Sequence, residues 1–565
     1  MSSPWLSHYD AGVPHTLFPY PEKTLLDVVR ETVRERPGHS AFLFKGARLS
    51  YGEFDRQSDA FAASLIASGV KKGDRVAIML PNCPQALIAQ FGVWKAGGIA
   101  SPVNPLYTEH ELEHALKENG AEVAVVLTPF YGKLKALQSR SKLRHIIATS
   151  IKEYLPPLLR IAFTLLKEKK EGHRITLLER DTWFQDELSR HARTPVTVDV
   201  SPSDHALLLF SGGTTGLPKA VLIRHHALVI AATQLRAWFS GVLTDWVNPI
   251  LATFPMFHVA GDVAILSVGL LTRNPIALVP NPRDLEDLIK TIKREKIAFL
   301  PAVPTLLNSI IARAADAKGG VDLRSIRLTL AGSAPLLAET KRRFEALTGG
   351  RVINVYSMTE AVMATLSSPA LGTFKDGSIG LPLPDVELRI VDAETGQHEV
   401  AQGEVGELAL RAPQLMEGYY NRPEATAEML RDGWLYTGDL GFMDADGYVT
   451  LVDRKKDVIK PSGFQVWPTE VEETIATHPS VAEVCVAGVP DPHQSEAVKA
   501  WVVLRPGTTL TAEELRTHCR ATLAAYKIPR HVEFRTSLPK SAVGKILRRE
   551  LVKEEAAATA PREVS

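Results

Sequence analysis

Chemistry is concentrated in a loop, Ser211–Lys219, that is dense in glycine and hydroxyl side chains and ends in a lysine. The glycines let backbone N–H groups approach phosphate oxygens without a clash from Cβ, and the hydroxyls and the ammonium add donors and positive charge. A plain glycine turn is the alternative, but the density of donors favours a nucleotide polyphosphate. The loop lacks the closing Gly-Lys-Ser/Thr of a P-loop kinase or ATPase. The candidate phosphate-binding residues are Ser211, Gly212, Gly213, Thr214, Thr215 and Gly216, with Lys219 as the neutralising cation.

Further along the chain, single basic or acidic side chains stand in short segments rich in small residues. They are His258, Glu360 with Thr359 before it, Asp439 and Lys545. Each has an ordinary interpretation: a core histidine, a pair that caps a helix, an aspartate in a turn and a lysine in a solvated basic run. Taken one by one, these residues therefore do not establish a catalytic site.

In their order along the chain, these segments resemble the motifs of the adenylate-forming superfamily. This superfamily contains acyl-CoA synthetases, the adenylation domains of peptide synthetases and beetle luciferases, and the resemblance covers residues 24–553. The motifs after the phosphate loop are Pro255–His258 (PMFH), Ala331–Pro335 (AGSAP), Asn354–Glu360 (NVYSMTE), Tyr436–Asp439 (YTGD), Asp453–Asp457 (DRKKD) and Pro539–Arg549 (PKSAVGKILRR).

Three positions depart from the usual motifs of the superfamily. Gly212 stands where serine is common, a variant familiar from fatty acyl-CoA synthetases, and Ala220 replaces the glycine that usually closes the loop. Ser357 replaces the glycine of the Tyr-Gly-x-Thr-Glu motif. The added methyl of Ala220 bears on the mobility of the loop rather than on nucleotide binding.

The resemblance implies how ATP would be bound. Thr359 would contact the α-phosphate, and Glu360 would hold Mg²⁺, which accepts one or two protein carboxylates and keeps several waters. Asp439 would take both ribose hydroxyls, as a bidentate acceptor can, and the Ala331–Pro335 turn would stack against adenine. Besides the loop, the residues so assigned to ATP and AMP are Gly332, Ser333, Ala334, Pro335, Asn354, Tyr356, Ser357, Asp439 and Arg454, and the metal ligands are Glu360 and Thr214.

The resemblance also implies an acyl pocket, a hinge and a thioester loop. Asp453 would be the hinge about which a mobile C-terminal domain turns. Small side chains around Val259 leave room for a chain or a ring, whereas Asp262 could instead be a polar feature of the same segment. The acyl-pocket residues are His258, Val259, Gly261, Gly332 and Met358, the thioester step would use Lys460, Gly463 and Phe464, and the catalytic residues are Lys545, Glu360, Thr359, His258 and Lys219.

The implied reaction is the ATP-dependent activation of a carboxylic acid to acyl-AMP and then to acyl-CoA, with release of pyrophosphate and AMP. ATP, Mg²⁺ and CoA are the expected cofactors. Gly212–Gly213, the Ile151–Lys170 segment and the run GKILRREL look most like bacterial long- or medium-chain fatty acyl-CoA synthetases. The alternatives are an aryl-CoA ligase, an acyl-AMP ligase that loads a carrier protein, a luciferase-like oxygenase and a non-catalytic nucleotide-binding scaffold.

The elements that must position these residues form an α/β pattern. Short apolar runs alternate with helical patterns such as Tyr51–Ser68, which predicts parallel-rich sheets covered by helices. The runs expected to form buried strands are Arg75–Leu80, Glu122–Leu127, Ala206–Phe210 and Ile297–Leu300. Strands at Val386–Val391 and Gly406–Arg411 predict a small β subdomain. A compact α+β pattern follows Asp453 and includes a helix near Ala512–Ala525. The expected domains are therefore residues 1–452, which bind AMP and the acyl group, and residues 453–565, which carry Lys545.

Composition limits the partners and the compartment. The 565 residues contain 65 Lys and Arg against 64 Asp and Glu, so no global charge points to nucleic acid. Three widely spaced cysteines, no secretory signal and no long apolar run favour the cytoplasm. The amphipathic segment 151–170 is either a membrane-surface helix, at the inner face of the membrane, or an ordinary surface helix. A homodimer is a further expectation.

Overall fold

The computed structural model describes residues 3–178, 180–211, 218–316, 321–461, 465–491, 495–541 and 544–559. The chain divides into two compact units: Met1–Glu387 with Arg411–Leu435, and Leu388–Leu410 with Tyr436–Ser565. The small β segment before Asp453 thus groups with the C-terminal part. The functional boundary at Asp453 itself stays a prediction.

One sheet of the first unit positions the phosphate loop. Its order is β19-β9-β8-β4-β3-β5-β6-β7, parallel from β8 to β7, with β9 and β19 antiparallel at one edge. The strands from β3 to β6 are apolar because helices bury them. The strands are β3 (Arg75–Met79), β4 (Ile99–Pro102), β5 (Val123–Leu127), β6 (His145–Thr149), β7 (Thr182–Trp183), β8 (His205–Phe210), β9 (Ala220–Arg224) and β19 (Gly418–Tyr419).

A second run of strands in the first unit carries the other motifs. Its order is β16-β15-β14-β13-β12-β10-β11-β1-β2, parallel from β14 to β1 and antiparallel at both ends. The strands are β1 (Ser40–Phe44), β2 (Ala47–Ser50), β10 (Ile250–Ala252), β11 (Ile276–Leu278), β12 (Phe299–Ala302), β13 (Leu328–Ala331), β14 (Arg351–Met358), β15 (Met363–Ser367) and β16 (Ser378–Pro382).

Amphipathic helices cover these sheets and begin where the sequence supplies caps. Thr24, Ser50 and Thr108 each form a capping box with an acidic residue three positions on. The helices of this unit are α1 (Leu25–Glu35), α2 (Tyr51–Ala67), α3 (Pro84–Lys95), α4 (Glu109–Asn119), α5 (Tyr131–Ala136), α6 (Pro157–Leu166), α7 (Phe184–Arg190), α8 (His225–Phe239), α9 (Val268–Thr272), α10 (Leu285–Glu295), α11 (Pro304–Asp316), α12 (Ala338–Thr348) and α13 (Pro423–Met429), with a π-helix at Ala260–Ser267 and the short strand β20 (Leu430–Arg431).

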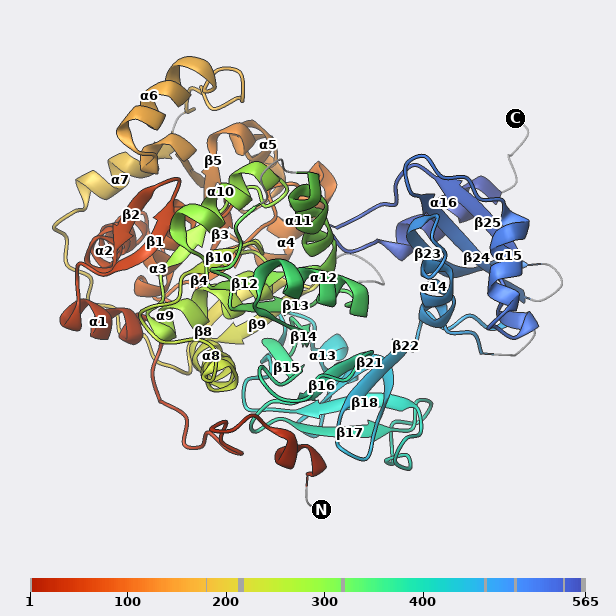
Figure 1. The fold of residues 1–565 in the computed structure, drawn as a ribbon. Helices are drawn as coiled ribbons and strands as arrows, with labels where there is room; N and C mark the ends of the chain where they lie inside the picture. Colours follow the sequence, from red (N-terminus) through yellow and green to blue (C-terminus); the bar gives the residue numbers. More distant parts are fainter. Residues whose placement is uncertain are drawn as a thin grey trace. The chain divides into compact units, whose positions relative to one another are not determined.

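The second unit has a β segment and a compact α+β part. In the α+β part, β23 and β24 form an antiparallel hairpin and β25 adds in parallel to β24. Figure 1 shows α14, α15 and α16 grouped around these three strands. The helix expected over 512–525 ends earlier, at Arg520. The elements are β17 (Glu387–Val391), β18 (Gly406–Arg411), β21 (Trp434–Met443), β22 (Val449–Arg454), α14 (Pro468–Ala476), β23 (Val481–Asp491), β24 (Ser495–Leu504), α15 (Ala512–Arg520), β25 (His531–Arg535) and α16 (Arg548–Thr559).

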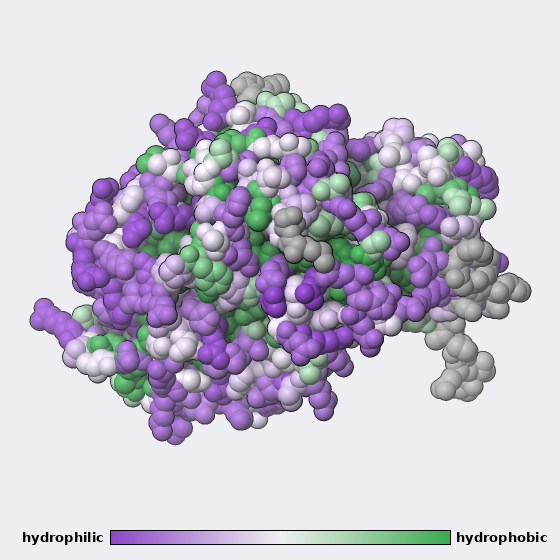
Figure 2. Space-filling model, turned by 90° about the horizontal axis from the view of Figure 1, so that it is seen from below, coloured by the Kyte–Doolittle hydropathy of each residue, from purple (hydrophilic) through white to green (hydrophobic). Residues whose placement is uncertain are grey.

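The architecture confirms the predicted α/β class with its large sheet-rich part and its small C-terminal part of helices and sheet. On the face shown in Figure 2, hydrophilic residues cover most of the surface and hydrophobic residues show between them. Within the described ranges, no helix has both the length and the apolar character needed to cross a bilayer.

Candidate active site

The phosphate loop joins the two strands of an antiparallel hairpin. β8 pairs with β9 up to Phe210 opposite Ala220, and the N–H of Ser211 donates to the carbonyl oxygen of Lys219 over 2.9 Å. This hydrogen bond closes the base of the loop. Ala220, where the superfamily usually has glycine, is fully buried and packs with Ile99 and Leu208. The predictions at Gly212, Gly213, Thr214, Thr215 and Gly216 lie outside the described residues.

Three side chains from distant parts of the chain meet beside this loop. Glu360 lies just beyond the end of β14 and is 8% exposed. The hydroxyl of Tyr419 donates to Glu360 Oε1 over 2.8 Å, and Lys219 Nζ lies 4.8 Å from the centre of the Tyr419 ring. Burial, together with the charge of Glu360, raises the pKa of Tyr419 above its ordinary value, so the phenol keeps its proton. The sequence singled out Lys219 and Glu360 but missed Tyr419.

The turn that carries Glu360 is strained. The N–H of Val362 donates to the carbonyl oxygen of Thr359 over 3.1 Å, and Val362 has a φ of 51°. A β-branched residue rarely adopts a positive φ. Such strain persists where the surrounding structure fixes it, which is common at functional sites.

Glu360 suits a magnesium ion. Among the described residues, no three His, Cys, Asp or Glu side chains gather as a metal cluster. A metal bound here would take one carboxylate from the protein and its other ligands from water and phosphate, which is the way Mg²⁺ is commonly held. The second proposed ligand, Thr214, lies outside the described residues.

The turn expected to hold adenine follows β13 and precedes α12. A Cβ on Gly332 would lie 2.7 Å from Val355 Cγ1, so only glycine fits, and Ser333 adopts a φ of 65°. Ala334 is half-buried and Pro335 is exposed. In the neighbouring strand β14, Asn354 uses its amide nitrogen to donate to the Ser378 carbonyl oxygen over 3.0 Å.

A small cavity of about 10 Å³, room for about one water molecule, lies next to this turn. Of the predicted acyl-pocket residues, Gly332 lines it, and so do Ser333 and Ser357, which the sequence assigned to the nucleotide. His258, Val259, Gly261 and Met358 are not among the lining residues, whereas Ala260 and Ala264 of the π-helix are. The lining residues are Phe254, Ala260, Ala264, Pro301, Leu330, Gly332, Ser333, Val355, Ser357 and Met363.

His258 and Gly261 shape the start of the π-helix instead. The N–H of Ala260 donates to His258 Nδ1 over 3.2 Å, and the His258 ring stacks on Phe254 with centres 5.8 Å apart. A Cβ on Gly261 would lie 2.1 Å from the Pro255 carbonyl oxygen, so glycine is required there. Their direct contact with an acyl group stays a prediction.

The π-helix also carries an unusual buried carboxyl. Asp262 is fully buried, and Gln90 Nε2 donates to its Oδ2 over 2.9 Å, while its Oδ1 has no hydrogen-bond partner among the described residues. Loss of water raises the pKa of Asp262 from 3.8 to about 7, and the hydrogen bond from Gln90 offsets this only in part.

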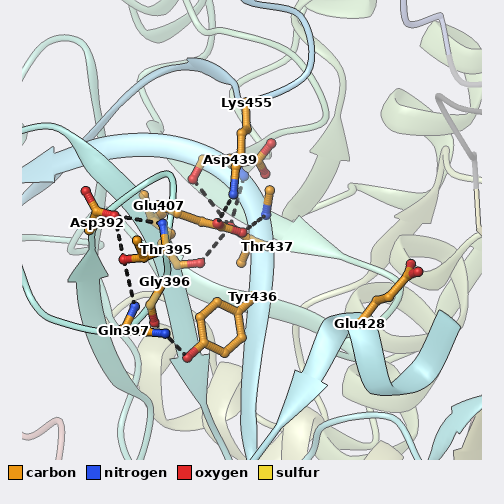
Figure 3. Close-up of polar contacts among 12 residues, drawn as sticks. Asp392, Thr395, Gly396, Gln397, Glu407, Glu428, Tyr436, Thr437, Asp439 and Lys455 are labelled. Carbon is orange, nitrogen blue, oxygen red and sulfur yellow. Dashed lines mark hydrogen bonds and ion pairs between the residues drawn. The ribbon is translucent and has the colours of Figure 1, made fainter. Parts of the chain in front are cut away.

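In the second unit, the segment around Asp439 is held by a network shown in Figure 3. The N–H of Gly438 donates to Glu407 Oε1 over 3.0 Å, and Lys455 Nζ binds the other oxygen of Glu407 over 3.2 Å. Asp439 is 7% exposed, and its carboxylate pairs with Arg454 Nε over 2.9 Å. These two side chains, both assigned to the nucleotide, are therefore adjacent.

The predicted hinge residue is anchored by the C-terminal helices. Asp453 accepts backbone N–H groups from Arg454 and Thr469, each over 2.8 Å. Arg548 Nη1 lies 3.7 Å from its Oδ1, and Arg548 also binds Asp457 over 2.8 Å and Glu472 over 2.9 Å. Burial raises the pKa of Asp453 and of Glu472, and the charge of Arg548 acts against that shift.

The predicted catalytic lysine lies in the same unit. The backbone of Lys545 exchanges hydrogen bonds with Ser541, and its side chain is exposed. Even so, the protein atoms around the ammonium displace water and Arg454 repels it, which lowers the pKa of Lys545 from 10.5 to about 8, while Asp439 acts in the opposite direction. Lys460 is exposed and its N–H donates to Glu496, whereas Gly463 and Phe464 lie outside the described residues.

Comparison with known proteins assigns the class of this fold and site. Residues 29–420 match the family model of the AMP-binding enzymes, and residues 470–545 match the C-terminal domain of the AMP-binding enzymes. The chain belongs to the AMP-binding enzyme family.

Two relatives align over nearly the whole chain. The long-chain-fatty-acid–CoA ligase of Bacillus subtilis (strain 168) is 39% identical over 554 residues, 98% of each chain. The ligase of the same name from Escherichia coli O157:H7 is 35% identical over 556 residues, again 98% of each chain. Among solved structures, the anthranilate CoA ligase AuaEII in complex with anthranoyl-AMP superimposes with a TM-score of 0.83 at 27% identity, covering 96% of this chain and 98% of that one.

The buried carboxyl of Asp262 predicts a loss of stability as the pH rises. Because its folded pKa is raised, full stability is present below the unfolded pKa of 3.8 and is lost as the pH rises through about 7. The loss from this group is about 4 kcal/mol at most. We expect Asp262→Asn to remove it, so thermal unfolding should favour the variant over the wild type more at pH 8 than at pH 5. The exposed Asp316→Asn is the control, and an equal difference at both pH values would contradict the assignment.

Proposed function

We propose that this protein activates a fatty acid with ATP to acyl-AMP and then transfers the acyl group to CoA. The observation that carries the proposal is the meeting of Lys219, Tyr419 and Glu360 at the base of the phosphate loop, because it joins the cation and the carboxylate that an ATP site needs. The relatives named as long-chain-fatty-acid–CoA ligases over 98% of the chain support the fatty acid and CoA.

In the first half-reaction, a carboxylate oxygen of the acid attacks the α-phosphorus of ATP and pyrophosphate leaves. Because two anions must meet, neutralisation of charge supplies most of the acceleration. Lys219 and Lys545 are the cations, Thr359 donates to the α-phosphate, and Asp439 with Arg454 holds the ribose. Mg²⁺ held by Glu360 would supply further positive charge.

In the second half-reaction, the C-terminal domain turns about Asp453 and the thioester loop with Lys460, Gly463 and Phe464 takes the place of Lys545. The CoA thiol loses its proton, its sulfur attacks the acyl carbonyl carbon, and AMP leaves. One site then serves two reactions through a conformational step.

The small cavity beside the Gly332 turn is a candidate end of the acyl site. Its lining is mostly apolar, and Ala260 and Ala264 leave space along one wall. Its volume of about 10 Å³ is far below the ~300–1,000 Å³ of typical ligand pockets, so it does not select a chain length.

The function is tested by pyrophosphate release with acids of graded length and aromaticity, with and without CoA. Sustained release with fatty acids only when CoA is present supports the proposal, and the optimum length identifies the substrate. Preference for aromatic acids would favour an aryl-CoA ligase, as in the anthranilate CoA ligase that this chain resembles. Release without a CoA effect would favour loading of a carrier protein, and no release with any acid would overturn the proposal.

The two half-reactions should depend differently on Lys545. We expect Lys545→Ala to slow adenylation by about 100- to 1,000-fold. The rate of thioester formation from supplied acyl-AMP should stay within about threefold of the wild-type rate. Because the pKa of Lys545 is lowered to about 8, the kcat/KM of adenylation should fall as the pH rises through that value in the wild type. Lys553→Ala, an exposed lysine of α16, is the control, and equal losses in both half-reactions would reject the assignment.

Contact with an anionic membrane surface is a further part of this proposal, and α6 supports it. No residue of α6 is buried, and Leu158, Ile161 and Leu165 are 82%, 57% and 78% exposed. They lie on one side of the helix, at spacings of three and four.

The charges near this helix are mainly basic. Within residues 151–172 five basic residues outnumber three acidic ones, and exposed Lys167, Lys169 and Lys170 follow the helix. An apolar face beside basic residues suits an anionic lipid surface. Figure 1 shows α6 at the periphery of its unit.

We expect the protein to float with vesicles that contain anionic lipid and not with neutral ones. Leu158→Ser, Ile161→Ser and Leu165→Ser together should abolish flotation while acyl-CoA formation from a water-soluble short-chain acid persists. The control changes Leu106, Leu178 and Val247 to Ser, since they are also exposed but scattered. Unchanged flotation of the α6 variant would show an ordinary surface helix. The expected homodimer is checked by sedimentation.

A further inference from the structure

Tyr419 occupies a position that the backbone fixes from several sides. The short strand β19 pairs with β9, which begins one residue after Lys219, with Tyr419 opposite Val221 and the N–H of Tyr420 donating to the Ala220 carbonyl oxygen over 2.8 Å. The N–H of Tyr419 donates to Thr426 Oγ1 over 2.9 Å. Three residues earlier, the N–H of Met416 donates to the carbonyl oxygen of Glu360 over 3.0 Å. The backbone of this segment is thus tied both to the loop and to Glu360.

The hydroxyl of Tyr419 orients the Glu360 carboxylate. It lies 2.8 Å from Oε1 and also 2.8 Å from Met429 Sδ, but its single proton is better accepted by the charged carboxylate than by a thioether. A tyrosine phenol has an ordinary pKa of about 10, so at neutral pH its O–H is a donor. One oxygen of Glu360 is thereby fixed, and Oε2 is left for a cation.

The ring of Tyr419 contacts the positive charge of Lys219. Lys219 Nζ at 4.8 Å from the ring centre is within the range of a cation–π contact. In the described part of the chain, Lys219 and Glu360 form no direct ion pair. A direct pair would neutralise both groups before ATP arrives, so an aromatic ring that contacts each of them keeps the lysine available for phosphate and the carboxylate available for a metal.

We propose that Tyr419 is a positioning residue for the adenylate-forming half-reaction, which holds Glu360 and Lys219 in place and apart. This inference rests on the proposed function. It assigns Tyr419 no contact with the reacting atoms and therefore no role in the transfer of the acyl group from acyl-AMP to CoA.

The test compares Tyr419→Phe, which removes only the hydroxyl, with the wild type. Binding of Mn²⁺, as a paramagnetic substitute for Mg²⁺, is titrated by electron paramagnetic resonance in the presence of a non-hydrolysable ATP analogue. We expect Tyr419→Phe to weaken Mn²⁺ binding about tenfold or more, since a hydrogen bond to a charged group is lost. Adenylation should need correspondingly more Mg²⁺, with the KM for the acid unchanged and thioester formation from supplied acyl-AMP within about twofold of the wild type.

Two further variants complete the test. Tyr420→Phe is the matched control, because its ring lies over Arg75 and not over Lys219, and it should behave as the wild type. Tyr419→Leu removes the ring as well and should further weaken binding of the ATP analogue. Its thermal unfolding identifies a variant that fails to fold.

The outcomes separate this inference from the function on which it rests. A wild type without ATP-dependent pyrophosphate release would overturn the proposed function. An active wild type whose Mn²⁺ affinity is unchanged in Tyr419→Phe would overturn the positioning role. Equal losses in both half-reactions would also overturn it, because they indicate a general structural defect.

Discussion

The pairing of β19 with β9 is the contact on which the candidate site of the first unit depends. It brings residue 419 to the end of a loop two hundred positions earlier in the chain, and the adjacent bond from Met416 to the Glu360 carbonyl oxygen adds a third segment. The strand has only two residues, so side-chain contacts must secure it. Tyr419 provides them through its bond to Glu360 and its contact with Lys219. The charged groups thus help to hold the strand that positions them.

The sequence predicted the strands, turns and helices that neighbouring residues determine. The strand before the phosphate loop, the turn after β13 and the helix α2 follow from apolar runs, glycines and caps, and the structure places them within one to two residues of the expected bounds. Where a strand was predicted to stop at Leu300, it continues through Pro301 to Ala302, because parallel pairing with β13 at Leu328–Ala331 extends it. A proline usually argues against continuing a strand, because it lacks the N–H that the ladder needs. Here the pairing with β13 outweighs that local preference.

The long-range contacts could not be predicted in the same way. Tyr419 stands in a segment, Gly418–Arg422, with no spacing or charge pattern that points to Glu360. Asp262 was seen as a polar residue among small ones, but its complete burial beside Gln90 depends on the packing of α3 against the π-helix. Likewise, Arg548 follows the predicted catalytic lysine in a basic run that is usually solvated, yet three carboxylates surround it. Each of these cases requires a partner that only the fold supplies.

Under the proposed function, charge balance is a reason for cations of both units to contribute to adenylation. In the first unit, the described groups beside the loop are one cation and one carboxylate, which nearly cancel, whereas ATP brings several negative charges. The second unit supplies Arg454 and Lys545. The lowered pKa of Lys545 means that loss of water, and after it the charge of Arg454, disfavour its ammonium, and the phosphates of ATP would offset that penalty by attracting both cations. A lysine made unfavourable in the free protein therefore gains more from the approach of ATP than a fully solvated lysine would, and loses that gain once pyrophosphate has left. In the proposed reaction, the departure of pyrophosphate would therefore favour the expected turn of the C-terminal domain between the two half-reactions.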